Sequence, residues 1–258
     1  MPTNNKDLLT RVNASGFPFQ LKIEQEIQDH NQGSVLAREH YWVSPNSEHE
    51  GFIDLIIAIG NHNNKLVIEC KRVRDAEWVF LVPKDEHKTN ITRVLSTMMV
   101  HEGRSDATWD KFSHGPYCVD AEFCIIRGQG EKQQPMLERL SAILLRSVEA
   151  LEYEERDYPV DGQGIRSYCP VIVTTATLQV CQYQSSKIDL ISGKLETADF
   201  LEVKYIRFTK SMPSSLTSSS SPLRLSDAAE ENKRSVFVVN AEYLVEFLKK
   251  EWHLVRLG

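Results

Sequence analysis

The chain has 258 residues, of which 41% are hydrophobic and 26% charged, so an ordinary globular core can form in one domain or in one domain with an elaborated end. No apolar run approaches the roughly 20 residues of a transmembrane helix, and the polar N-terminus lacks the apolar stretch of a secretory signal. A net charge of -6 argues against coating nucleic acid through bulk charge, but it leaves room for an enzyme with a local basic groove. We therefore expect a soluble, cytoplasmic protein with no membrane partner.

The N-terminal third predicts a polar, frayed start, then a helix and a β-hairpin. Proline suits the first helical position, so the helix is expected to begin at Pro18, and Phe19, Ile23 and Ile27 recur every four residues on its inward side. Short apolar runs bounded by turn residues predict strands, with a turn at 61–64 inside the hairpin. The strands expected here are 39–44, 51–60, 65–73 and 78–82.

The remaining chain alternates strand-like and helix-like segments, which implies an α/β or α+β layered fold. The Ser- and Pro-rich segment 211–226 predicts a flexible loop. The five cysteines contain no Cys-x-x-Cys pair, so buried reduced thiols are expected rather than a zinc site. The expected elements are strands 119–127, 171–175, 178–183, 200–209 and 236–239, and helices 134–152 and 240–252.

Charged side chains interrupt both apolar runs of the expected hairpin. Asp54 lies in the middle of Phe-Ile-Asp-Leu-Ile-Ile-Ala-Ile, and Glu69 and Lys71 lie at the end of the next run. Burying a polar group without a partner costs roughly 2–7 kcal/mol, so these residues need a reason. Side chains alternate along a strand, so Glu69 and Lys71 share a face. With a four-residue loop at 61–64, Asp54 is expected opposite Lys71 and diagonal to Glu69.

This arrangement of charges suits a metal ion and a phosphate. Two carboxylates at such a range repel each other by roughly 1–4 kcal/mol, and a divalent cation reverses the sign of that interaction. Hard oxygen ligands suit Mg²⁺ (or Mn²⁺), which keeps several waters and binds substrate phosphates. Lys71 would orient or help deprotonate the attacking water, or stabilise charge on the phosphate. The pattern therefore indicates phosphodiester hydrolysis.

The same residues resemble the PD-(D/E)XK, or restriction-endonuclease-like, nuclease superfamily, which places an aspartate on one strand and Glu-x-Lys on the next strand of a hairpin. Here these are Asp54, fourteen intervening residues and Glu69-Cys70-Lys71. Ile53 replaces the proline of the motif, at a position that varies within the superfamily. The order of helix, strand and hairpin from Phe17 to Val82 also looks like the family core, whereas the rest of the chain matches no family closely.

The resemblance implies an α/β fold with a restriction-endonuclease-like core, a mixed central sheet flanked by helices and a C-terminal β/α elaboration. Residues 1–210 would form the core with additional strands, 211–235 a flexible Ser-rich loop, and 236–258 a strand and helix that complete the same domain. The implied catalytic residues are Asp54, Glu69, Lys71 and Glu26. The implied metal ligands are Asp54, Glu69, Glu26 and the backbone carbonyl of Cys70.

The upstream glutamate has two candidates, Glu24 and Glu26. Glu26 is preferred because it falls three residues after Ile23 on the inward side of the helix, although a solvated helix charge is an equal alternative. The motif also has a competing match, Asp189 with Glu202-Val203-Lys204, which lies among polar residues rather than in apolar runs. The plain alternative for Asp54, Glu69 and Lys71 is a structural ion pair across the hairpin.

Several basic residues follow the hairpin, with Trp109 nearby. They could line a groove that follows the phosphates of a nucleic acid, or they could be scattered, solvated charges. Scattered charge is the preferred interpretation. The basic residues are Lys84, Lys88, Arg93, Arg104 and Lys111.

The function expected from these features is that of a Mg²⁺-dependent endo- or exodeoxyribonuclease acting on DNA in restriction, phage defence or repair. The alternatives are a catalytically inactive nuclease-fold module that binds nucleic acid or a protein partner, and a subunit of a larger complex. A homodimer is a further option.

Overall fold

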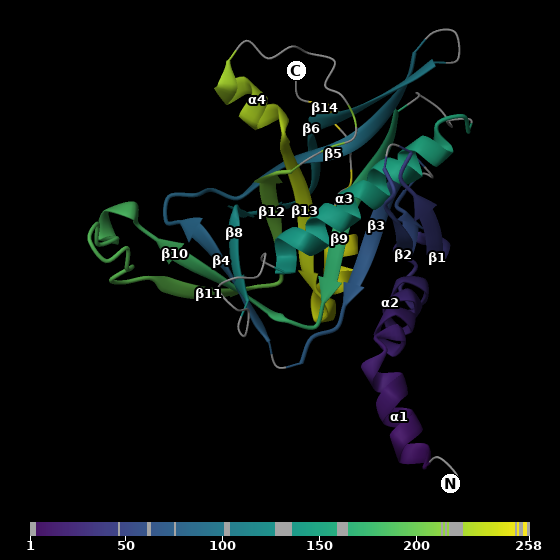
Figure 1. Cartoon of the computed structure of the whole chain (residues 1–258), viewed down its shortest axis with the longest axis horizontal. Coiled ribbons are helices and arrows are strands. Elements are labelled where there is room, and N and C mark those ends of the chain that lie inside the picture. Colours follow the sequence, from purple (N-terminus) through teal and green to yellow (C-terminus); the bar gives the residue numbers. More distant parts are fainter. Residues whose placement is uncertain are drawn as a thin grey trace.

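The computed structural model (Figure 1) describes most of the chain, without the side chains of 99–100, 104–106 and 256. The described residues are 4–45, 47–60, 63–74, 76–100, 104–126, 136–158, 165–212, 214, 216, 224–250, 252 and 255–256. The helices are α1 (Asn5–Ala14), α2 (Phe17–Asp29), α3 (Met136–Glu155), α4 (Leu225–Glu231) and α5 (Leu244–Leu248). Among the described residues, no helix is long and apolar enough to cross a membrane.

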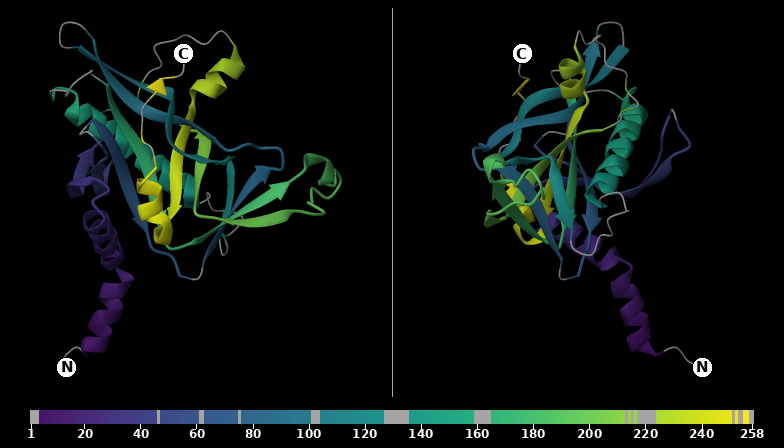
Figure 2. Two further views of the ribbon diagram at one scale, coloured as in Figure 1. Left: turned by 180° about the vertical axis from the view of Figure 1, so that it is seen from behind. Right: turned by 60° about the vertical axis from the view of Figure 1, so that its left-hand side comes forward.

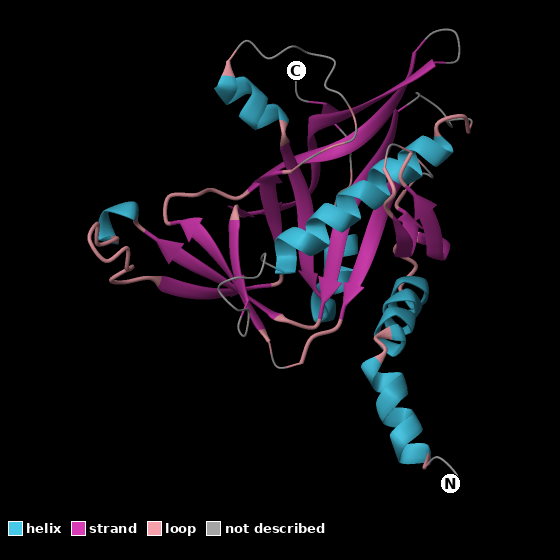
Figure 3. Cartoon of the chain, in the orientation of Figure 1, coloured by secondary structure: helices cyan, strands magenta, loops and turns pink. Residues whose placement is uncertain are grey.

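The described strands form a ten-stranded mixed sheet and a second, four-stranded sheet (Figure 3). The main sheet runs β1 (Ser34–Val43), β2 (Glu50–Ala58), β3 (Asn64–Lys71), β9 (Ile165–Thr174), β13 (Lys233–Asn240), β12 (Tyr205–Ser211), β7 (Asp120–Ala121). Its other strands are β5 (Thr89–Val100), β6 (Arg104–Cys118) and β14 (Val255–Arg256); β5 pairs with β6 and β9, and β14 pairs with β6. The second sheet runs β11 (Asp199–Val203), β10 (Thr177–Tyr183), β4 (Glu77–Pro83), β8 (Phe123–Ile126).

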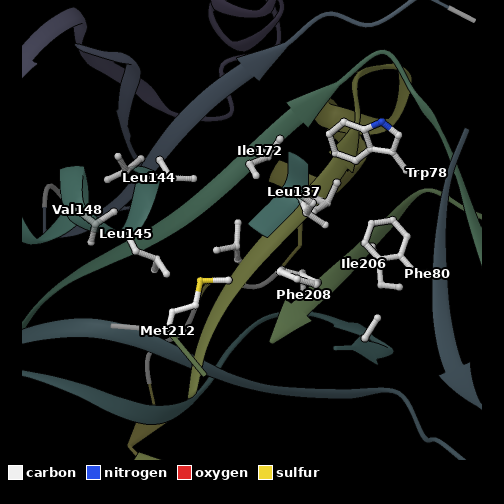
Figure 4. Close-up of a cluster of buried hydrophobic side chains, with 14 of the residues drawn as sticks. Trp78, Phe80, Leu137, Leu144, Leu145, Val148, Ile172, Ile206, Phe208 and Met212 are labelled. Atoms are coloured by element: carbon white, nitrogen blue, oxygen red, sulfur yellow. The ribbon is translucent and has the colours of Figure 1, made fainter. Parts of the chain in front are cut away.

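Helices cover both faces of the main sheet, because its strands are apolar on both sides. Helix α3 crosses one face, where Val67 and Ile172 pack against Leu144 and Val148. This α3-side cluster continues under the second sheet to Trp78 and Phe80, as Figure 4 shows. On the opposite face, α2 and α5 contribute Ile23, Ile27, Leu244 and Phe247 to a second buried cluster, which we call the α2–α5 cluster.

Two strands pass from the main sheet into the second sheet side by side. In the main sheet β3 is parallel to β9 as far as the pair Lys71↔Thr174. After a short crossing, β4 and β10 are again parallel neighbours, beginning with Glu77↔Thr177. Figure 1 shows the two crossings together at the bottom of the view. The carboxyl ends of β3 and β9 therefore meet at a corner between the sheets.

The expectation of a mixed α/β fold with a mixed sheet flanked by helices is confirmed. The strands expected at 51–60, 65–73, 78–82 and 178–183 correspond to β2, β3, β4 and β10, and β13 covers 236–239. The helix expected at 134–152 corresponds to α3, although residues 134 and 135 lie outside the described part, as do residues 61–62 of the expected turn.

Other predicted elements were wrong where local signals were incomplete. The expected frayed start contains α1, whose Asn4 side chain accepts a hydrogen bond from the backbone N–H of Lys6. The single strand expected at 200–209 is divided at Lys204 into β11 and β12, which belong to different sheets. The strand expected at 119–127 is likewise β7 and β8, and the long β5–β6 hairpin was not predicted.

The C-terminal prediction was partly wrong as well. The loop expected at 211–235 contains α4 and the start of β13. The helix expected at 240–252 is a short 3-10 turn followed by the five residues of α5. Asn240 is the N-cap of this turn, since its side chain accepts a hydrogen bond from the backbone N–H of Glu242.

Candidate functional site

Asp54 lies at the point where β2 separates from β3. The backbone pairing of the two strands extends from Ala58↔Lys65 only to Leu55↔Ile68. Beyond that pair, a side-chain contact replaces the backbone pairing: Oδ2 of Asp54 accepts a hydrogen bond from the backbone N–H of Cys70 at 2.6 Å. The carboxylate therefore occupies the gap that opens between the strands, directly beside the Glu69-Cys70-Lys71 segment.

The observed register corrects the predicted one by two residues. Ala58 pairs with Lys65 and the N–H of Ile59 donates to the carbonyl of Asn64, so the loop is 60–63 rather than 61–64. Gly60 belongs to the turn because its φ of 71° lies in the left-handed region that favours glycine. Continued by one position, this register places Asp54 across from Glu69, with Lys71 diagonal to it. The predicted pairing of Asp54 with Lys71 was wrong, but a shift of two leaves the facing unchanged.

Strand alternation directs the charged side chains of β3 to the α3 side of the sheet. Ile68 and Cys70 pack into the α2–α5 cluster on the other face. Asp54, Glu69 and Lys71 are each half-buried, so the pair of carboxylates remains in contact with solvent. The three side chains lie close enough to interact electrostatically, and none of them is fully buried.

Burial makes both carboxyl groups weaker acids than usual, and repulsion by Asp54 adds to this effect at Glu69. Burial raises the pKa of Asp54 to about 6, although the N–H of Cys70 and the ammonium of Lys71 both lower it. Burial also raises the pKa of Glu69 to about 7, with the charge of Asp54 as the next largest contribution. Among the ion pairs of the described residues, none joins Lys71 to either carboxylate. Lys71 therefore acts on both carboxylates through its charge and not through a direct ion pair.

Glu39 is a third carboxylate of this site that the sequence did not reveal. It lies in β1 between the pairs Arg38↔Leu55 and His40↔Ile53, which places it across from Asp54. Its φ of 48° is a left-handed conformation, unusual for a non-glycine residue inside a strand. Its charge raises the pKa of both Asp54 and Glu69. No sequence pattern predicts this irregular backbone conformation.

The structure places the two candidate helix glutamates differently. Glu26 pairs with Lys22 at 2.5 Å and with His30 at 3.5 Å, both on its own helix. Glu24 is the more buried of the two, and its carboxylate reaches Arg38 of β1 at 3.4 Å. Neither contributes to the pKa shifts of Asp54 and Glu69, where Glu39 does. Glu39, and neither helix glutamate, therefore contributes to the electrostatics of Asp54 and Glu69.

Gln20 of α2 holds the backbone of the site in place. Its side-chain N–H donates to the backbone carbonyl of Asp54 at 3.0 Å, and the side chain is almost fully buried. Gln20 shares the inward face of α2 with Ile23 and Ile27. A polar residue on an apolar helix face was the signal that could have identified it, by the same logic that identified Asp54 in its strand.

The donor atoms at the site fit a small divalent cation that keeps most of its water. Among the described residues, no three Asp, Glu, His or Cys side chains converge closely enough to hold a metal on their own. Mg²⁺ needs fewer, since it is commonly bound by one or two carboxylates together with waters and substrate phosphates. Asp54 and Glu69 form a pair of that kind.

The basic residues that follow the hairpin are mostly used in separate ion pairs. Lys84 pairs with Asp199 at 2.8 Å, and Arg93 and Lys111 both pair with Glu230. The neighbouring Trp109 is buried and donates its indole N–H to a glutamate of α3. The side chain of Arg104 lies outside the described part. This distribution agrees with scattered charges and not with a continuous groove.

The competing motif match has a local structural explanation. The carboxylate of Asp189 accepts hydrogen bonds from the N–H and hydroxyl of Ser192 within one turn. Glu202 lies in β11 opposite Gln179. Asp189 therefore stabilises the loop that joins β10 and β11.

Comparisons of the chain with protein-family models, with curated proteins and with solved structures found no match. The protein thus has a mixed α/β fold, with two half-buried carboxylates at the point where β2 separates from β3. The case for a particular activity depends on those carboxylates.

Proposed function

We propose that this protein is a metal-dependent nuclease that hydrolyses phosphodiester bonds of DNA at Asp54, Glu69 and Lys71. The observation that carries the proposal is the placement of two carboxylates across from each other where β2 and β3 diverge, half-buried and with raised pKa values. Buried charges are normally paired or bound to metal, and the nearest ammonium does not form an ion pair with either. A divalent cation would remove the repulsion between them.

The order of elements supports the finer assignment to a restriction-endonuclease-like fold. Helix α2 is followed by the antiparallel strands β1, β2 and β3, which is the order of helix, strand and hairpin that carries the resemblance. The aspartate lies on β2 and the Glu-x-Lys segment on β3, as in that superfamily. The parallel strand β9, preceded by α3, then completes the sheet beside β3.

Each residue has a distinct part in the proposed reaction. Asp54 and Glu69 would hold Mg²⁺ or Mn²⁺, which when bound supplies positive charge next to a phosphate oxygen. Lys71 lies on the same face of β3 as Glu69, and its ammonium would orient the attacking water or stabilise charge on the phosphate. The N–H of Cys70 orients the Asp54 carboxylate, and Gln20 holds the Asp54 backbone.

The test is cleavage of plasmid and linear DNA in Mg²⁺ or Mn²⁺ by the wild-type chain and by Asp54→Asn, Glu69→Gln and Lys71→Met. We expect each variant to lose at least ~100-fold in rate, as removal of a charge-stabilising group does in other active sites. Asp85→Asn, in an exposed turn, is the control and should cut normally. Site variants that cut as fast as the wild type would remove the catalytic assignment.

Metal binding gives a readout that does not depend on activity. A ligand that binds only the folded state raises the melting temperature, so MnCl₂ should stabilise the wild type but not Asp54→Asn. The absence of a three-carboxylate metal group among the described residues favours a second candidate, a nuclease-fold module that binds nucleic acid without cutting. Stabilisation that is equal in both proteins, together with DNA binding but no cleavage, would favour that candidate.

A further inference from the structure

A cavity of about 710 Å³ opens at the corner where β3 and β9 leave the main sheet. Among the described residues, its polar lining comprises Arg72, Arg74, Glu77, Thr175 and Thr177. The last residue pair of the parallel strands β3 and β9 is Lys71↔Thr174. The cavity begins at the next residue after each strand, Arg72 and Thr175. It is therefore adjacent to the candidate catalytic lysine along β3.

The position of the cavity in the fold favours a ligand. In α/β proteins, ligands bind beyond the carboxyl ends of parallel strands. Here β3 and β9 end together, and their continuations enter a different sheet as β4 and β10. The cavity lies between the two sheets. Its described lining residues belong to the connection from β3 to β4, to the connection from β9 to β10 and to the first residues of β4 and β10.

The two arginines of the cavity are presented by a backbone that is held in place. The hydroxyl of Thr175 donates to the carbonyl of Val73 at 2.8 Å and accepts the N–H of Val73 at 2.9 Å. Val73 lies between Arg72 and Arg74, so both guanidinium groups extend from a braced segment. Arg72 also donates to the backbone carbonyl of Asn13 in α1. Arg74 is exposed and forms no ion pair with any described residue.

We propose that this cavity binds a phosphodiester group of the nucleic acid strand, next to the phosphodiester that is cleaved. The inference rests on the proposed nuclease function and assigns it a second phosphate contact. A guanidinium group matches phosphate with two parallel hydrogen bonds, and the hydroxyl of Thr177 is a further donor. Glu77, paired in register with Thr177, is the opposing charge at the edge of the cavity.

The experiment measures binding of a fluorescent DNA oligonucleotide in EDTA, where cleavage does not interfere, at several salt concentrations. Arg74→Gln is chosen because Arg72 also contacts α1. We expect a roughly 5–10-fold loss of affinity and a salt dependence shallower by about one counterion, in line with the loss of one phosphate contact. Arg224→Gln, an exposed arginine before α4 with the same change in charge, should stay within about twofold.

A change of opposite sign at the same cavity sharpens the test. Glu77→Gln removes the opposing carboxylate and should tighten oligonucleotide binding by roughly 2–3-fold, the effect of one exposed charge. Inorganic phosphate serves as the second probe. Binding of phosphate that is lost in Arg74→Gln while oligonucleotide affinity is unchanged would identify a free-phosphate site and overturn the proposal.

The outcomes separate this proposal from the proposed function. Unchanged oligonucleotide binding by Arg74→Gln, with cleavage that still depends on Asp54, removes the cavity assignment and leaves the nuclease. Weakened binding by Arg74→Gln, in a chain whose cleavage does not depend on Asp54, supports the phosphate contact and removes the nuclease. A wild-type chain that does not bind the oligonucleotide overturns the cavity assignment.

Discussion

Asp54 and Glu69 destabilise the metal-free fold at neutral pH. Their raised pKa values mean that the folded state binds protons more tightly than the unfolded state. From about pH 4, near the ordinary carboxyl pKa, up to the folded values of about 6 and about 7, the unfolded chain has lost protons that the folded chain keeps. The free energy of unfolding therefore falls as pH rises through this window, and the loss is complete above it.

Asp54→Asn should accordingly stabilise the metal-free protein at pH 8 by about 1–3 kcal/mol, at 1.4 kcal/mol for each pKa unit with partial screening by solvent. The amide oxygen of asparagine still accepts the N–H of Cys70, so the local geometry is retained. The gain should be smaller at pH 4.5, where the folded aspartate is already protonated. Urea unfolding at the two pH values, with EDTA present, measures both.

Asp85→Asn, at an exposed turn, is the control for this experiment and should show no gain at either pH. A destabilised Asp54→Asn variant at pH 8 would contradict the electrostatic account of the site. It would indicate that the carboxylate is stabilised by a partner and is therefore structural.

Helix α2 positions the site through one polar contact in an apolar interface. Gln20 lies with Ile23 and Ile27 on the buried face of the helix, and its amide satisfies the Asp54 carbonyl where β2 leaves β3. That carbonyl has lost its place in a regular ladder, and an unpaired buried carbonyl costs about 1–3 kcal/mol. The helix thus compensates for the opening between the strands.

Gln20→Met keeps the length and apolar contacts of the side chain but removes the donor. We expect a loss of about 1–2 kcal/mol in the free energy of unfolding, together with weaker Mn²⁺ stabilisation, because Asp54 is no longer held. The matched control is Gln25→Met on the exposed side of α2, where the amide bonds only to Asp29. Equal unfolding midpoints for the two variants would show that the contact has no effect on the site.

At the scale of the whole molecule, one buried arginine joins segments that are far apart in the sequence. The guanidinium of Arg207 in β12 donates to both oxygens of Asp120 in β7, at 2.7 and 2.8 Å. It also donates to the carbonyl and hydroxyl of Thr89 at the start of β5. Its side chain is fully buried, so these contacts are protected from solvent.

Arg207→Lys should lower the free energy of unfolding by about 2–4 kcal/mol, because an ammonium cannot reproduce a two-pronged contact with a carboxylate. Since the α3-side cluster runs under both sheets, the loss should appear in a single cooperative transition. Arg139→Lys, exposed on α3, is the control. A second transition in the variant would show that the sheets unfold separately.

Local signals were sufficient for part of the site. The sequence revealed Asp54, Glu69 and Lys71 because burying a charge inside an apolar strand has an unfavourable free energy. A charged residue in an apolar run can be seen within one short segment of sequence. Glu39 was not recognisable, because its own left-handed backbone conformation in β1 has no signature in the sequence. Gln20 required knowledge of which carbonyl would be left without a strand partner.

The sequence by itself determined the apolar strands of the hairpin, the inward face of α2, the α3 helix and the three charges of the motif. These follow from periodicity and from the free energy of burying charge, both of which act over a few neighbouring residues. Only the tertiary structure decided the β2–β3 register, the division of 200–209 between two sheets, the third carboxylate and the arginine-lined corner beyond Lys71. Each of these depends on pairing between segments distant in the chain, and local physical chemistry does not specify such pairing.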